Sequence, residues 1–171
     1  MGNLRVSWED YHRQIEQLAV QIHDSGWEFD RIVCLARGGL RVGDVLSRLF
    51  DRPLAILFAS SYGGAGGRSR GELHFSQALA MTDRDLGGRV LVADDLADTG
   101  MTLARSLDWL RQHYGDRLVE LRTAVLWCKA CSTVRPDYYG VFLADNPWIE
   151  QPFEVYDAMD LDQLAQKYAD P

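Results

Sequence analysis

A chain of 171 residues, 47% hydrophobic and 25% charged, is long enough for one well-buried domain and too short for two ordinary ones, so we predict a single domain over residues 1–171. Eighteen basic against 25 acidic residues give a net charge of −7, which argues against a nucleic-acid-binding surface. The sequence shows neither a signal-peptide pattern nor an apolar run approaching about 18 residues, so we expect a cytoplasmic protein without a membrane span.

The first part of the chain predicts a helix, a strand and a second helix. Ser7 and Asp10 resemble a capping box, and the apolar residues that follow at helical spacing are Tyr11, Ile15, Leu18 and Ile22. The apolar run RIVCLA, residues 31–36, is typical of a buried strand. After the glycine turn RGGL, helical spacing resumes at Val42, Val45, Leu46 and Leu49.

The remaining elements alternate in the same way. A second apolar run, residues 54–59, leads into the glycine-rich stretch at residues 60–73, where we predict a long mobile loop with strand edges at its ends. Residues 90–93 predict a third buried strand and residues 102–114 a helix. Two more strands and a short amphipathic helix are predicted at residues 121–128, 138–144 and 155–171.

Strands that alternate with helices favour an α/β fold, in which a mostly parallel twisted sheet carries helices on both faces. In such sheets, ligands bind beyond the carboxyl ends of the strands. We therefore expect the functional site to include the loop that follows the strand at residues 90–93.

The three cysteines do not suggest a disulfide scaffold, because their number is odd. Cys128 and Cys131 form a CxxC pair, but a structural zinc site needs two more ligands. A redox pair should open a helix, whereas residues 132–136 read as a loop. We interpret both thiols as incidental groups near the end of a strand.

The stretch VLVADDLADTG places three carboxylates, Asp94, Asp95 and Asp98, before Thr99 and Gly100. Hydroxyls, free backbone N–H groups and the positive end of the following helix suit a phosphate. The carboxylates would repel that phosphate unless they bind sugar hydroxyls, hydrated Mg²⁺ or a proton in transit. A solvated acidic turn would explain one acid but not three. The sequence contains no GxxxxGK[ST] and no GxGxxG between a strand and a helix, and the spacing of Asp95 and Asp98 is one residue too wide for a DxD loop. The pattern therefore favours a phosphorylated sugar as ligand.

This loop resembles the phosphoribosyl pyrophosphate loop of the type I phosphoribosyltransferases. Further matches follow in register: LARGGL at residues 35–40, SSY at residues 60–62, Lys129 after a strand, and WIEQPF at residues 148–153. Over roughly residues 6–155 the motifs are similar to those of the bacterial xanthine-guanine (purine) members of the family. The resemblance implies the fold of that family, with a small hood formed by the C-terminal segment.

By this resemblance, Asp98 is the catalytic residue, which faces N7 of a purine base and takes up its proton. Asp94 and Asp95 would hold the ribose hydroxyls directly or through Mg²⁺, so they are the implied metal ligands and Mg²⁺ the implied cofactor. The implied site for the ribose and its 5′-phosphate comprises Asp94, Asp95, Asp98, Thr99, Gly100, Met101 and Thr102.

The resemblance also implies a pyrophosphate site formed by Arg37, Gly38 and Gly39. It implies a cis peptide bond between Ala36 and Arg37, an arrangement usually kept for function. Ser61 and Tyr62 belong to a flexible loop that would close over the site. Arg68 and Arg70 either reach the pyrophosphate on closure or remain solvated loop charges, and the sequence leaves both alternatives open.

For the base, the resemblance assigns three residues. Lys129 would donate to the 6-oxo group, Trp148 would stack on the ring, and backbone groups near Ile149 would read its edge. A lysine donor facing a 6-amino group would be left unpaired, so adenine should be rejected. The alternative for Trp148 is an ordinary core aromatic.

The resemblance therefore implies a Mg²⁺-dependent purine phosphoribosyltransferase of purine salvage. It would transfer 5-phosphoribosyl from phosphoribosyl pyrophosphate to guanine, xanthine or hypoxanthine, and its relatives are homodimers or homotetramers. Two alternatives stay open, a regulatory protein of the same fold that senses phosphoribosyl pyrophosphate and a transferase for another base. Such a regulator should carry a basic patch or an added DNA-binding segment, and the sequence contains neither.

Overall fold

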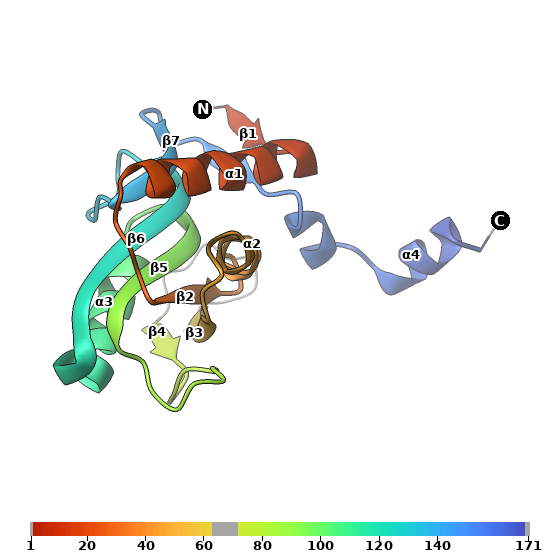
Figure 1. The fold of residues 1–171 in the computed structure, drawn as a ribbon. Helices are drawn as coiled ribbons and strands as arrows, with labels where there is room; N and C mark the ends of the chain where they lie inside the picture. The colour runs from red at the N-terminus through yellow and green to blue at the C-terminus, as the bar shows by residue number, and fades with distance from the viewer. Residues whose placement is uncertain (1, 63–71, 170–171) are drawn as a thin grey trace. The chain divides into compact units, whose positions relative to one another are not determined.

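The computed structural model describes residues 2–62 and 72–169, which form strands and helices that alternate along the chain (Figure 1). In chain order the elements are β1 (Asn3–Arg5), α1 (Trp8–Asp24), β2 (Arg31–Ala36), α2 (Leu40–Phe50), β3 (Leu54–Tyr62), β4 (Glu72–Phe75), β5 (Gly88–Ala97), α3 (Met101–Tyr114), η1 (Gly115–Arg117), β6 (Leu118–Lys129), β7 (Tyr138–Leu143), β8 (Trp148–Glu150), η2 (Glu154–Asp157) and α4 (Leu161–Lys167).

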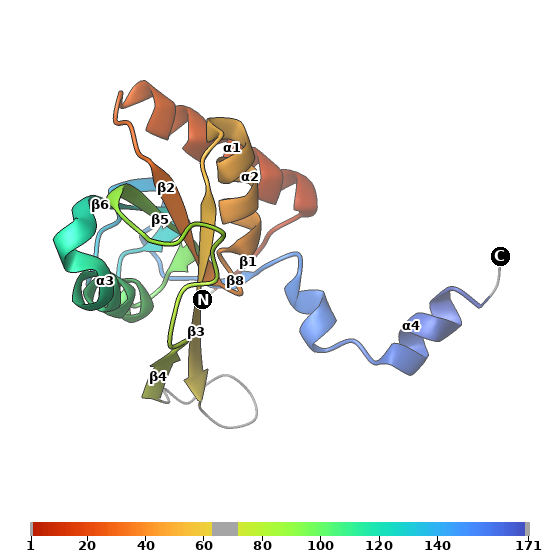
Figure 2. The same cartoon turned by 60° about the horizontal axis from the view of Figure 1, so that its bottom comes forward.

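The chain forms two compact units, one that runs from Gln14 to Asn146 and one that combines the residues up to Arg13 with those from Pro147 onward. The larger unit contains a six-stranded sheet in the order β4-β3-β2-β5-β6-β7. All neighbouring pairs in it are parallel except β3 with β4, which are antiparallel at the sheet edge (Figure 2). The predicted α/β fold with a mostly parallel sheet is confirmed, and the single domain over residues 1–171 stays a prediction.

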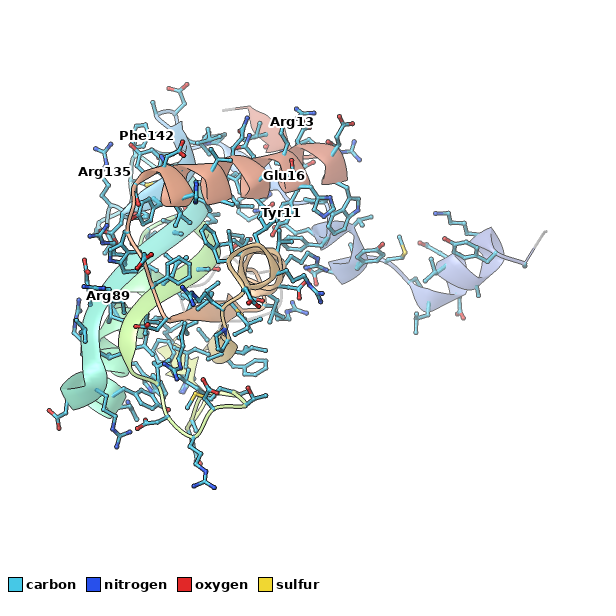
Figure 3. All side chains as sticks on the ribbon, in the orientation of Figure 1. Tyr11, Arg13, Glu16, Arg89, Arg135 and Phe142 are labelled. Atoms are coloured by element: carbon cyan, nitrogen blue, oxygen red, sulfur yellow. The ribbon has the colours of Figure 1, made fainter. Side chains whose placement is uncertain are left out.

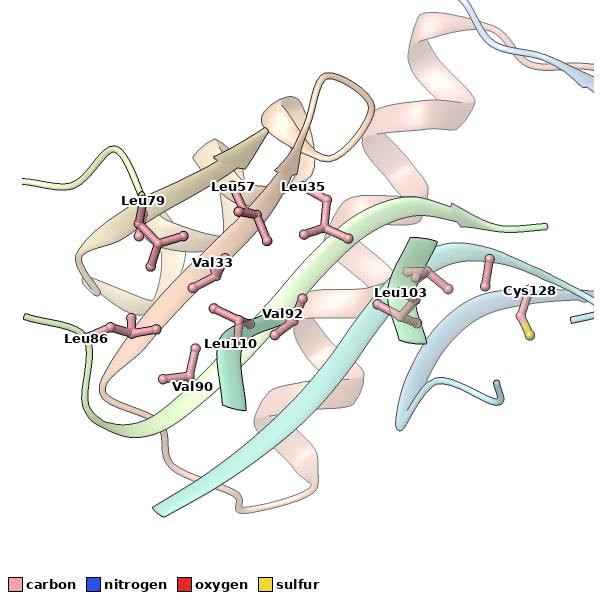
Figure 4. Packing of buried hydrophobic residues seen from close by; sticks show 13 residues of the cluster. Val33, Leu35, Leu57, Leu79, Leu86, Val90, Val92, Leu103, Leu110 and Cys128 are labelled. Carbon is pink, nitrogen blue, oxygen red and sulfur yellow. The ribbon is translucent and has the colours of Figure 1, made fainter. Parts of the chain in front are cut away.

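Helices cover both faces of this sheet because side chains alternate between the faces along each strand. Val33 and Leu35 of β2 belong to a buried cluster that includes Leu103 and Leu110 of α3 (Figure 4). Cys34 lies between them in sequence and faces α2 on the opposite side. Each fully buried leucine of this kind stabilises the fold by about 1.5–3 kcal/mol relative to an exposed one. The two helix layers thereby hold the carboxyl ends of the central strands in place.

Most predicted elements are present with small shifts at their ends. The helices at residues 102–114 and within 155–171 are confirmed as α3 and α4, and strand edges do flank the glycine-rich stretch, as β3 and β4. One prediction was wrong in extent, because β5 continues four residues beyond the predicted end at Ala93. Its pairing with β6 persists, with Asp94 opposite Val125 and Ala97 opposite Cys128, so Asp94 and Asp95 lie on a strand rather than on a loop.

The smaller unit contains the parallel pair β1–β8, in which Leu4 lies opposite Ile149. α1 begins in this unit, and the predicted capping box is present, since the Asp10 N–H donates to Ser7 Oγ at 3.0 Å. Arg13 then forms an ion pair with Asp10 on the exposed side of the helix (Figure 3). Across residues 2–62 and 72–169, none of the helices combines the length and the apolarity that a bilayer crossing requires.

Candidate functional site

A cleft of about 330 Å³ opens at the carboxyl ends of β2 and β5. It is lined by residues 35–38 and 94–100, together with Ala59 of β3 and Thr102 and Leu103 of α3. The volume is in the range of small-molecule sites, and the place is the one where parallel α/β sheets bind ligands. Eight of the predicted site residues line this cleft, namely Arg37, Gly38, Asp94, Asp95, Asp98, Thr99, Gly100 and Thr102, and so does Ala36, which precedes the predicted cis bond.

Two adjacent carboxylates, Asp94 and Asp95, line the cleft. Asp94 is 9% exposed, and its Oδ1 accepts a hydrogen bond of 2.9 Å from the backbone N–H of Asp95. Burial, reinforced by the neighbouring charge of Asp95, raises the pKa of Asp94 well above the usual range of a carboxyl group. Burial also raises the pKa of Asp95, while the charge of Arg41 on α2 acts in the opposite direction. The pair therefore concentrates negative charge that a cation or sugar hydroxyls would stabilise.

This raised pKa predicts that Asp94→Asn stabilises the protein. A carboxyl with a higher pKa in the folded chain than in the unfolded chain weakens folding increasingly as pH rises from the unfolded pKa through the folded one. The amide carries no charge and can still accept from Asp95. We expect thermal unfolding at pH 8 to show a gain of about 1 kcal/mol, or about 2–4 °C in Tm, that shrinks towards pH 5.

The exposed Asp116, replaced by asparagine, is the matched control for this comparison. Its carboxylate is solvated, so we expect no comparable gain at pH 8. An Asp94→Asn gain that is the same at pH 8 and pH 5, or a loss at pH 8, would contradict the electrostatic explanation.

Asp98 and Lys129 form an ion pair at the side of the cleft. The Nζ of Lys129 lies 3.0 Å from Oδ1 of Asp98, and the lysine side chain is 7% exposed against 54% for the aspartate. The register of β5 and β6 produces the pair. Ala97 lies opposite Cys128, so the residues that follow them, Asp98 and Lys129, are neighbours. The sequence motifs imply separate partners for the two residues on a base, and their mutual contact was not predicted.

The loop between β5 and α3 leaves a helix N-terminus open to the cleft. Gly100 has φ of +78°, a left-handed conformation that favours glycine, and it precedes the first residue of α3. Gly100 has no side chain that could cap the helix, and the first turn has no acidic residue. The Met101 N–H makes only a long contact of 3.5 Å with Thr99 Oγ1. The N–H groups of this first turn and the positive end of the helix dipole suit an anion such as a phosphate.

The loop after β2 contributes the other side of the cleft. The peptide bond between Ala36 and Arg37 is cis, as predicted. A Cβ on Gly38 would lie 2.4 Å from Oδ1 of Asp95, which is much closer than any real contact. A larger residue at this position would force the Asp95 carboxylate or the loop to move, so Gly38 and Asp95 form one local structure.

The remaining predicted residues lie elsewhere or outside the described residues. Ser61 and Tyr62 are the last residues of β3, where their backbone pairs with β4. Arg68 and Arg70 lie outside the described residues, so their two alternatives stay open. Trp148 and Ile149 belong to β8 of the smaller unit, where Trp148 is 57% exposed, unlike a core aromatic, and Ile149 is buried.

Two more predicted site residues lie at the starts of helices. Gly39 lies immediately before α2, and Met101 is the first residue of α3. Cys34, Cys128 and Cys131 are free thiols, and burial raises the pKa of Cys128. Within the part of the chain that the structure describes, no three histidine, cysteine or acidic side chains gather as a metal-binding group.

Comparison with known proteins identifies the family. The model of the phosphoribosyl transferase domain matches residues 7–158, so the chain belongs to this family of transferases. The xanthine-guanine phosphoribosyltransferase of Idiomarina loihiensis is 28% identical over 152 residues, which cover 88% of this chain and 86% of that protein. The family match extends across both compact units.

Solved structures agree with this assignment. The crystal structure of a purine phosphoribosyltransferase from Pyrococcus horikoshii is similar with a TM-score of 0.71 at 29% identity, covering 90% of this chain and 95% of that one. The xanthine-guanine-hypoxanthine phosphoribosyltransferase of Helicobacter pylori shares the fold with a TM-score of 0.73 at 23% identity, over 96% and 99% of the two chains. The fold implied by the sequence motifs is therefore confirmed.

Proposed function

We propose that the chain is a purine phosphoribosyltransferase that transfers 5-phosphoribosyl from phosphoribosyl pyrophosphate to a 6-oxopurine. The observation that carries this proposal is the pairing of Lys129 Nζ with Asp98 Oδ1, a buried donor beside an exposed acceptor. A 6-oxopurine presents O6 and N7 side by side on one edge. Lys129 donates to O6 and Asp98 accepts from N7–H, so one pair of side chains recognises both groups.

In the proposed reaction, the bond between the anomeric carbon and the pyrophosphate oxygen breaks as a bond to purine N9 forms. The ribose passes through a state that resembles the oxocarbenium ion of glycoside hydrolysis. Asp98 takes up the N7 proton, and Arg37 stabilises the negative charge on the departing pyrophosphate. The open N-terminus of α3 holds the 5′-phosphate, and Asp94 and Asp95 bind the ribose hydroxyls.

The acidic pair also fits the proposed cofactor Mg²⁺. Asp94 and Asp95 are adjacent oxygen donors, and burial raises the pKa of both, because it disfavours the negative charge that a cation would stabilise. Mg²⁺ prefers oxygen ligands and is often held by one or two carboxylates together with substrate phosphates. When bound, the ion would neutralise charge on the pyrophosphate. Asp94 and Asp95 are the residues that would hold it.

The donor chemistry of Lys129 restricts the base. Its ammonium group has three donors and no acceptor, so a 6-amino group opposite it would leave donors facing each other. A site that loses such a buried hydrogen bond discriminates strongly against the wrong base. The relatives whose names include guanine, xanthine and hypoxanthine support the same substrate class. We therefore propose that adenine and uracil are not used.

The test is to incubate the protein with phosphoribosyl pyrophosphate, Mg²⁺ and, separately, guanine, xanthine, hypoxanthine, adenine and uracil. We expect nucleotide from at least one 6-oxopurine, none from adenine or uracil, and loss of product when a chelator removes the Mg²⁺. Chromatography of the products measures each outcome. Binding of phosphoribosyl pyrophosphate without conversion of any base would favour the regulatory alternative, and conversion of uracil alone would favour a transferase for another base.

A further inference from the structure

A turn at residues 130–134, which we call the bracing turn, packs against residues 98–100 of the loop that precedes α3. Cys131 Sγ donates to the backbone oxygen of Asp98 at 3.4 Å. Ser132 lies against Gly100, where a Cβ would be 2.5 Å from the serine Oγ. Thr133 binds the residue between them, Thr99. Three consecutive loop residues are thus each contacted by the turn.

Thr133 makes the strongest of these contacts. Its backbone N–H donates to the carbonyl oxygen of Thr99 at 2.9 Å, and its hydroxyl donates to the same oxygen at 3.0 Å. In a trans peptide group the C=O and the N–H point to opposite sides. Fixing the Thr99 carbonyl on the turn therefore directs the Gly100 N–H away from it, and Thr99 and Gly100 both line the cleft.

The bracing turn is itself held firmly. The Ser132 N–H donates to the Lys129 carbonyl at 3.0 Å, and the Cys131 N–H donates to Asn146 Oδ1 at 3.1 Å. Beyond the turn, the Arg135 guanidinium lies 5.8 Å from the ring centroid of Phe142 on β7 (Figure 3). The turn can thus impose one orientation on the loop rather than adapt to it.

We infer that Thr133 is a positioning residue for the phosphate subsite, which holds the Thr99–Gly100 peptide so that its N–H faces the 5′-phosphate. This inference rests on the function proposed above. Thr133 touches no reacting atom, and it acts through the loop. Successive N–H groups that converge on one point form an anion-binding concavity, so their orientation before binding determines the affinity.

The experiment compares Thr133→Val, which keeps the shape but loses the hydroxyl, with Thr133→Ser, which keeps the hydroxyl. Thr133 is exposed, so neither change opens a cavity in the core. We expect Thr133→Val to raise the KM for phosphoribosyl pyrophosphate about three- to tenfold, the effect of one hydrogen bond, with KM for the base unchanged. Thr133→Ser should keep the wild-type KM for phosphoribosyl pyrophosphate. Thr82→Val, at another exposed threonine, should leave this KM unchanged as well.

A second readout does not depend on catalysis. Titration calorimetry with ribose 5-phosphate probes the phosphate subsite together with the acidic pair that binds the ribose, and inorganic pyrophosphate probes the loop after β2. We expect Thr133→Val to weaken the first about three- to tenfold and to leave the second unchanged. If the wild type binds ribose 5-phosphate but converts no base, the inference still holds while the proposed function fails. An unchanged affinity in Thr133→Val, an equal loss for both ligands, or no binding by the wild type overturns the inference.

Discussion

Replacing Asp98 by asparagine is expected to lower kcat for nucleotide formation by about 10²–10⁴-fold, the usual contribution of a positioned acid–base group. The amide has nearly the same size and can still accept a hydrogen bond, but it cannot take up the N7 proton. KM for phosphoribosyl pyrophosphate should stay close to the wild-type value, because asparagine keeps the shape of the loop and the acidic pair is unchanged. Steady-state kinetics with a saturating 6-oxopurine measures both constants.

This substitution also removes the counter-charge of a nearly buried ammonium group. Lys129 is 7% exposed and its partner is 54% exposed, so the ion pair lies between the exposed and the buried case. We expect Asp98→Asn to lower the free energy of unfolding by about 1–3 kcal/mol, which thermal unfolding would measure. A lower kcat in Asp98→Asn therefore has two candidate causes, the unpaired charge of Lys129 and the loss of the proton acceptor.

The double variant Asp98→Asn with Lys129→Met separates these two causes. It removes the lone ammonium group, so the stability should recover in part while kcat stays low. Lys129→Met alone should instead raise KM for the base, because it removes the donor to O6. Recovery of kcat in the double variant, or a normal kcat in Asp98→Asn, would show that Asp98 is not the proton acceptor.

Local motifs predicted which residues share the loop before α3. Asp98, Thr99 and Gly100 lie next to one another in the chain, so their spacing already indicates which groups share a loop. The glycine at position 100 has the left-handed conformation that the transition from loop to α3 requires. The family resemblance likewise predicted the cis bond between Ala36 and Arg37 from one short motif.

Contacts between distant segments could not be predicted from such motifs. Lys129 meets Asp98 only because β5 and β6 pair in one register, and nothing in either motif fixes that register. The end of β5 was misplaced for a related reason. Hydrogen bonds from the neighbouring strand β6 keep Asp94 and Asp95 extended, although charged residues usually indicate the end of a buried strand.

The pairing of the short strands β1 and β8 could not be predicted either, because they lie near opposite ends of the chain. Each has three residues, and they pair across most of the chain, with Asn3 opposite Trp148. Three residues carry too little periodicity to predict a strand. The bracing turn was also missed, because the contact of Thr133 with Thr99 depends on two loops that meet only after the sheet has formed.

Replacing Gly38 by alanine tests the close approach of the β2 loop to the acidic pair. The new methyl group would lie 2.4 Å from Oδ1 and 2.7 Å from Cγ of Asp95, so the carboxylate or the loop must move. A displacement of about 1 Å in a catalytic group can cost about 10²-fold in rate. We expect kcat/KM for phosphoribosyl pyrophosphate to fall by about that factor, and the concentration of Mg²⁺ needed for half-maximal rate to rise.

The matched control is Gly115→Ala at the end of α3, where a Cβ would meet nothing within 4 Å and φ is −49°. That variant should keep wild-type kinetics, and alanine there should not destabilise the fold. Gly38→Ala meets a side chain rather than backbone, so the fold can adjust by moving Asp95 and Tm should fall only slightly. If Gly38→Ala keeps full activity, Asp95 does not need its observed position for catalysis. If it unfolds instead, the β2 loop and β5 are coupled through the backbone as well as through Asp95.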